Sequence, residues 1–345
     1  MKNLTTLLCL FFLNTSILLA QDILLAQDTS IYVIPKWNNM VLETINKFPS
    51  KGGYYTGGKP NKLFSKTAAQ GMNEAFMMNP SDSFPNIDVN KAQPSFCSLA
   101  TYMVLLKTIL DYDTLHIVSK ESWQNLKPYI GIKDSINSTG FSQGDGIGCW
   151  GRANANGPGF GVLISELGVG CNIYGFRGAK EDKYKDPNWH EEYESDSEWA
   201  EDEVWRNAEP GDFMKIFWDN NSTSGKDNGA VIGYNANSGE LSERGHMVVF
   251  LGYTPEGDVK YWSSNGPGEH PEKNGYGIAT TPKNRIQRVI FTRILVPENF
   301  NNAQYFMPDN EQSWLKSLDG KHRGTSSELR YWIGDEWWIT KTTQY

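Results

Sequence analysis

The sequence predicts an α+β fold in which one long helix packs on a small antiparallel β-sheet. Apolar residues recur at spacings of three and four over residues 96–110, which gives this segment one apolar helical face. Short apolar runs follow in the second half of the chain, and their lengths are typical of strands. The expected strands are 213–218, 247–253, 259–263 and 287–296. Such strands suit an antiparallel sheet that buries the helix on one face.

The long helix is expected over residues 97–111. Ser95 is a favourable N-cap residue, and Pro94 before it marks the start of the helix. Cys97 would then take about the second helical position. Shorter helices are expected at 41–47, 121–130 and 162–167.

Two of the expected strands form a hairpin. The run at 247–251 is apolar throughout and leads to a turn at 254–258, after which the chain returns as the strand at 259–263. His246 would lie near one end of the first strand, and Asn265 near the matching end of the second.

Cys97, His246 and Asn265 are the residue types of a cysteine nucleophile, its base and the residue that orients the base. A thiol attacks a carbonyl carbon only as the thiolate, which a helix N-terminus and a nearby imidazolium both favour. An asparagine can hold the imidazole in one tautomer. Each residue also has a simpler interpretation: a buried structural thiol, a hydrogen-bonded core or surface histidine, and a turn asparagine.

The segment 245–278 resembles the His and Asn region of papain-like cysteine peptidases. The shared pattern is a Gly-His pair that opens an apolar strand, followed by Gly-Tyr, Tyr-Trp, an Asn and a Gly-Tyr-Gly-Ile run. His246 follows Cys97 by about 150 residues, within the range of the papain pattern. The resemblance extends over roughly residues 91–297 and implies a papain-like fold.

A second stretch is similar to compact members of the same superfamily. Pro210-Gly211-Asp212-Phe213, at the start of an expected strand, resembles the corresponding stretch of NlpC/P60 and CHAP domains, which cut bacterial cell-wall peptides. This resemblance favours peptide or amide bonds of peptidoglycan as the substrate. The alternatives are a protease that acts on proteins, an acyl transferase of the transglutaminase type, and a non-enzymatic binding protein on a papain-like scaffold.

The resemblance implies a role for each site residue. Cys97 would attack the amide carbonyl, His246 would exchange the proton and Asn265 would orient the imidazole ring. Gln93 is the candidate for the oxyanion-hole glutamine that papain-like enzymes carry before the nucleophile, and the backbone N–H of Cys97 is the alternative donor. No cofactor or metal is expected, and the motifs do not identify an inhibitor or immunity protein.

The cysteines and the N-terminus indicate an exported protein. Residues 1–20 read as a signal peptide with a basic start and an apolar run, and Ala26 offers an alternative cleavage point. The expected location is periplasmic or extracellular, without stable membrane insertion. Removal of the signal leaves three cysteines, which suggests a disulfide between Cys149 and Cys171 and a free Cys97. The alternative is three reduced thiols.

The remaining chain is expected to form extensions and loops around one catalytic domain. Residues 27–90 form an N-terminal extension, and residues 298–345 form an aromatic-rich C-terminal one. The glycine-tyrosine segment 52–58 either borders the site or is a flexible connection. Arg152, in a glycine-rich segment, either contacts a substrate carboxylate or belongs to a structured loop. The net charge of −8 argues against a nucleic-acid partner, because no basic stripe is present.

Overall fold

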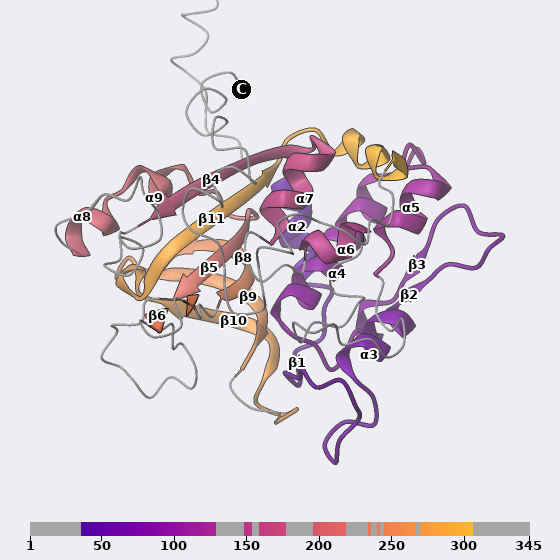
Figure 1. Cartoon of the computed structure of the whole chain (residues 1–345), viewed down its shortest axis with the longest axis horizontal. Helices are drawn as coiled ribbons and strands as arrows, with labels where there is room; N and C mark the ends of the chain where they lie inside the picture. Colours follow the sequence, from indigo (N-terminus) through magenta and orange to yellow (C-terminus); the bar gives the residue numbers. More distant parts are fainter. Residues whose placement is uncertain are drawn as a thin grey trace, which may run out of the picture. The chain divides into compact units, whose positions relative to one another are not determined.

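Seven strands form one antiparallel sheet in the part of the chain that the structure describes (Figure 1). This computed structural model describes residues 36–128, 148–153, 159–176, 196–218, 234–235, 240–241, 245–266 and 270–305. In order across the sheet the strands are β1 (Lys51–Gly52), β10 (Gly275–Thr281), β9 (Val259–Asn265), β8 (Gly245–Tyr253), β5 (Phe213–Trp218), β11 (Ile286–Ile294) and β4 (Gly170–Phe176). Each neighbouring pair is antiparallel. The predicted α+β fold with an antiparallel sheet is confirmed.

Helices lie on both faces of this sheet (Figure 1). They are α2 (Lys36–Ile45), α3 (Ala68–Ala75), α4 (Cys97–Tyr112), α5 (Lys120–Leu126), α6 (Gly148–Ala153), α7 (Phe160–Leu167), α8 (Asp196–Ala200) and α9 (Glu203–Asn207). Short 3-10 helices and two small strand pairs complete the described elements: η1 (Val89–Lys91), η4 (Lys283–Arg285), η5 (Pro297–Tyr305), β2 (Phe76–Met77) with β3 (Asn86–Ile87), and β6 (Tyr234–Asn235) with β7 (Glu240–Leu241).

The two faces of the sheet bury two separate apolar clusters. Successive side chains of a strand point to opposite faces, so β8 contributes Met247 and Val249 to one cluster and Val248 and Phe250 to the other. The first cluster contains the buried side chains of α4, which packs on β8 and β9. The second contains Trp199 and Trp205, from α8 and α9. His246 and Asn265 therefore lie on a sheet that is supported from both sides, and Cys97 begins the helix that packs on one of them.

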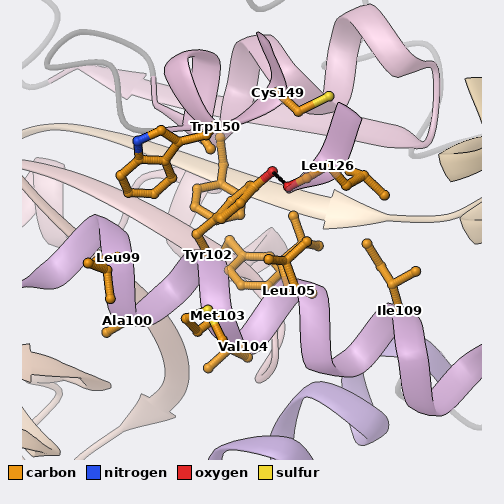
Figure 2. Close-up of a cluster of buried hydrophobic side chains, with 14 of the residues drawn as sticks. Leu99, Ala100, Tyr102, Met103, Val104, Leu105, Ile109, Leu126, Cys149 and Trp150 are labelled. Atoms are coloured by element: carbon orange, nitrogen blue, oxygen red, sulfur yellow. Dashed lines mark hydrogen bonds between the residues drawn. The ribbon is translucent and has the colours of Figure 1, made fainter. Parts of the chain in front are cut away.

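Helix α4 is buried on more than the one face that its apolar spacing predicts (Figure 2). Its side chains contact the sheet and also α2, α3 and α6. Figure 2 shows Tyr102 of α4 beside Trp150 of α6. The centroids of the two rings are 5.1 Å apart. The Tyr102 hydroxyl donates a 2.6 Å hydrogen bond to the carbonyl of Leu126. This packing fixes the position of the helix whose first residue is Cys97.

The long helix begins slightly differently from the prediction. Its N-cap is Phe96, so Cys97 is the first helical residue and Ser95 is not the cap. Ser95 is instead paired with the segment at 53–55: its N–H donates to Gly53 and its carbonyl accepts from Tyr55. The Ser95 carbonyl is thus bonded to Tyr55, and the first intrahelical hydrogen bond, from the Ala100 N–H, goes to the carbonyl of Phe96.

Three strands of the sheet, β1, β4 and β10, were not predicted from the sequence. β4 and β10 are rich in glycine, which has a low intrinsic preference for strands. β4 forms because it pairs with β11 along its length, and β10 forms because it pairs with β9. Pairing with an apolar neighbour overrides the local preference of these segments.

The predicted disulfide between Cys149 and Cys171 is wrong, because both residues are thiols in the structure. Cys149 belongs to the cluster on the α4 side of the sheet. Cys171 lies on β4 two residues from Ile173, whose side chain is in the cluster on the opposite side. Cysteines on opposite faces of a sheet cannot bring their sulfur atoms to bonding distance. Burial raises the pKa of the Cys149 thiol to about 12.

Other expectations fall outside the described residues. The signal peptide at 1–20 and its alternative cleavage point lie there. Residues 306–345, which make up most of the expected C-terminal extension, are also outside the described residues. Residues 298–305 belong to η5.

Candidate active site

Cys97 occupies the first turn of α4, where backbone N–H groups have no partner within the helix. Phe96 at the N-cap is extended and provides no side-chain acceptor for those groups. The Cys97 side chain is partly buried and packs at the edge of the α4 cluster. The helix start therefore presents a thiol together with N–H donors that have no partner within the helix, an arrangement that favours negative charge.

The thiol lies where β8 and β9 separate. The two strands pair from Val249 and Trp262 toward their shared turn, with a shift of register between Phe250 and Gly252. Beyond the Val249–Trp262 pair, away from the turn, the Ser263 hydroxyl donates a 2.7 Å hydrogen bond to the Met247 carbonyl. The Met247 N–H donates to the sulfur of Cys97. In a continuous hairpin, the carbonyl and N–H of Met247 would bond to the backbone of β9. Here the Ser263 hydroxyl and the Cys97 sulfur bond to them instead.

The same separation brings His246 of β8 and Asn265 of β9 together. Nε2 of His246 lies 3.1 Å from Oδ1 of Asn265. The orientation of the amide is fixed by Nδ2, which donates to the carbonyls of Ser263 and Gly277 at 3.2 and 2.8 Å. Oδ1 can only accept, so Nε2 carries the proton. In the neutral ring, Nδ1 is then the nitrogen that can take a proton from Cys97.

Two aromatic rings border His246. The Trp218 ring of β5 is stacked at a centroid distance of 6.3 Å, and the Tyr261 ring of β9 meets the imidazole edge-on at 5.6 Å. With these rings at its sides and Asn265 at Nε2, the imidazole has a defined orientation.

The charge balance at Cys97 favours the thiolate. Burial raises the pKa of the thiol. Three neighbours lower the pKa of the thiol by more than burial raises it. They are His246 through its hydrogen bond and charge, Lys215 through its charge, and the N–H of Met247. The net result lowers the pKa of Cys97 from 9.0 to about 6. At neutral pH the sulfur is therefore mainly anionic.

Lys215 is a site residue that the sequence analysis missed. It lies within the apolar run of β5, and only 7% of its surface is exposed. A single lysine in a run of apolar residues is the signal that could have identified it, because lysine is seldom buried without a specific role.

Gln93, the predicted oxyanion donor, packs against β1. An added Cβ at Gly52 would lie 2.3 Å from Oε1 of Gln93. The neighbouring residue Tyr54 forms a bridge with Ser95, and its ring borders Gly266, next to Asn265. The glycine-tyrosine segment therefore borders the site. The role of Gln93 stays a prediction.

Arg152 pairs with a carboxylate of the chain itself. Its Nε forms an ion pair with Glu166, which joins α6 to α7. The proposed contact with a substrate carboxylate stays a prediction, with Glu166 as the group that such a substrate would have to displace.

The described residues contain no cluster of three or more His, Cys, Asp or Glu side chains suited to a metal ion. None of the described helices combines the length and apolar character needed to cross a bilayer. No family model, curated protein or solved structure matches the chain.

Proposed function

We propose that this protein is a papain-like cysteine hydrolase of peptide or amide bonds, with Cys97 as nucleophile, His246 as base and Asn265 as orienting residue. The observation that carries the proposal is the chain of contacts from the Cys97 thiol through the imidazole to the Asn265 amide. These side chains come from α4, β8 and β9. A buried structural cysteine would not require a histidine whose tautomer is fixed toward it.

The reaction follows from the proton positions at this site. The thiolate of Cys97 attacks the amide carbonyl, and the imidazolium of His246 gives its proton to the departing amine as the C–N bond breaks. The neutral ring then takes a proton from water, whose oxygen attacks the thioester. The carboxylic acid is released and the thiolate is restored. The backbone N–H of Cys97 is available to the developing oxyanion.

Peptidoglycan peptides are the substrate that we propose. The Pro210–Phe213 stretch and the apolar N-terminus of an exported protein support this choice. In the structure, Gly211 of this stretch has a φ of +95° and Asp212 is fully buried. The stretch therefore serves to place β5 and contributes to the site through that strand.

The test compares peptidoglycan sacculi with a denatured protein as substrates. Purified protein should release soluble peptide fragments from sacculi, and Cys97→Ala should lower this activity by at least about 1000-fold. Cys149→Ala is the matched control, because it removes a buried thiol from another helix and should leave the rate close to that of the parent. Cleavage of the denatured protein alone would make the enzyme a protease. Binding to sacculi that survives Cys97→Ala, with no fragment released by the parent, would contradict the hydrolase proposal.

A further inference from the structure

The side chain of Lys215 lies on the face of the sheet that packs against α4. Directly paired residues of neighbouring strands share a face, and Lys215 is the partner of Met247. Met247 and Phe213, two residues before Lys215, both belong to the cluster that contains the α4 side chains. Strand register therefore directs the lysine toward the side of the sheet on which Cys97 begins its helix.

Close contact with Gly245 places the ammonium group of Lys215. An added Cβ at Gly245 would lie 2.8 Å from Cε and 2.9 Å from Nζ of Lys215. The Nζ atom also lies 5.6 Å from the ring centroid of Phe217. Glycine at position 245 leaves the space that the ammonium occupies, directly beside the backbone that leads into His246.

Met247 connects this cation to the nucleophile. Its N–H donates to the Cys97 sulfur, and Lys215 is its partner on the adjacent strand. Partnered residues have Cα atoms about 5 Å apart. The residue of β8 that contacts the sulfur is thus the one paired with Lys215, and little water surrounds a lysine that is 7% exposed. An electrostatic interaction is stronger in such surroundings than in bulk water.

We propose that Lys215 is a positioning residue of this site, whose fixed positive charge stabilises the anionic sulfur of Cys97. The inference rests on the proposed function. His246 changes its charge when it gives its proton to the departing amine, whereas Lys215 takes no part in that transfer. Its charge therefore supports the thiolate both as attacking group and as leaving group. Tyr261 on β9 and Arg288 on β11 are further ionisable side chains in this region, and Arg288 stacks on the Phe217 ring at 4.5 Å.

The test measures how fast iodoacetamide alkylates Cys97 across a pH series, with the modified peptide quantified by mass spectrometry. Lys215→Met and Lys215→Gln should raise the apparent pKa of Cys97 by about one unit and slow alkylation about tenfold near pH 5. Lys215→Arg keeps the charge and should leave the profile close to that of the parent. Circular dichroism confirms that each variant is folded.

Lys283→Met is the matched control. Lys283 is a partly buried lysine whose ammonium lies 4.6 Å from the Tyr253 ring and donates to the Ala200 carbonyl. Its removal should leave the Cys97 profile unchanged. An unchanged profile in a folded Lys215→Met or Lys215→Gln variant would overturn the inference. If neither neutral variant folds, Lys215→Arg decides: a profile like the parent's supports the inference, and a rise of about one unit overturns it.

The alkylation assay separates this inference from the proposed function because it needs no substrate. A shifted profile in a protein that hydrolyses nothing would support the role of Lys215 and contradict the hydrolase proposal. An unchanged profile in an active hydrolase would contradict the role of Lys215 and support the hydrolase proposal.

Discussion

Asn265 illustrates, at the scale of single residues, how backbone contacts specify the chemistry of a side chain. Its amide nitrogen is committed to two main-chain carbonyls, so its oxygen can only face His246. The protonated nitrogen of the ring is thereby chosen by β9 and β10, two strands that do not carry the nucleophile. Removing this control should affect the reaction more than the fold.

Asn265→Ala should therefore lower kcat/KM of the proposed hydrolase by about 30-fold, the equivalent of about 2 kcal/mol for a hydrogen bond to a charged partner. Steady-state kinetics with sacculus-derived peptides provides the measurement. Asn125→Ala is the control, since Asn125 also donates to a main-chain carbonyl, that of Ala303, but lies on α5. Equal losses in the two variants would show that the effect of Asn265 is structural.

The pKa of Cys97 predicts a pH dependence. Because the pKa is lowered to about 6, the rate of Cys97 alkylation should rise with pH around a midpoint near 6. The rate should reach its plateau well below pH 9.0. His246→Ala removes the hydrogen bond and the charge that lower the pKa, so the midpoint should move upward toward 9.0. Site-specific alkylation followed by peptide mass spectrometry measures both. A parent profile centred near 9.0 would mean that the thiol is not activated.

At the scale of elements, the separation of β8 from β9 creates the site. Ser263 closes the gap by donating to the Met247 carbonyl, and both residues are buried. This leaves the Met247 N–H for the Cys97 sulfur. A hairpin that paired regularly to its end would use that N–H in its own ladder, and the thiol would lose a donor.

Ser263→Ala should lower the free energy of unfolding by about 1–3 kcal/mol, because the Met247 carbonyl would be left buried without its donor. Ser264→Ala is a close control on the next residue of the same strand. The Ser264 hydroxyl is buried and has no hydrogen-bond partner in the described part of the chain, so its removal should leave stability unchanged or raise it. Urea denaturation of both variants makes the comparison, and equal destabilisation would contradict it.

At the scale of the whole molecule, a buried ionic network joins segments that are distant in sequence. Arg293 of β11 contacts both oxygens of Asp212 at 2.9 and 2.8 Å and pairs with Glu209 at 2.6 Å. Asn38 of α2 donates to Asp212 at 2.9 Å. The network ties α2 and β11 to the turn that leads into β5, and so helps to hold the strand that carries Lys215.

Arg293→Met should lower the free energy of unfolding by about 3–5 kcal/mol, because it leaves two buried carboxylates without their cation. Arg206→Met is the control: Arg206 is exposed, and its contact is with the carbonyl of Glu201. Urea denaturation, with the slope compared between variants, measures both. A loss below about 1 kcal/mol for Arg293→Met would show that the network contributes little to stability.

Much of the candidate site was predictable because each main residue follows a local signal. Cys97 starts an apolar periodic segment, His246 starts an apolar run, and Asn265 follows the returning strand. The structure places His246 in contact with both of the others. Lys215 was missed because strand periodicity shows only that its run is buried and not which residue of another strand it faces. The disulfide was predicted wrongly because cysteine counting ignores the face of the sheet on which each thiol lies.

Local patterns in the chain are enough to predict α4, the runs of β5, β8, β9 and β11, and the residue types able to perform cysteine chemistry. These features depend on periodicity and on short-range turn preferences, which are local properties of the chain. The folded chain adds the pairing of the glycine-rich β4 and β10, the gap between β8 and β9, and the pairing of Lys215 with Met247. These features depend on strand register and on long-range packing, where burial overrides local preference and where charges from distant segments meet in a medium of low polarity.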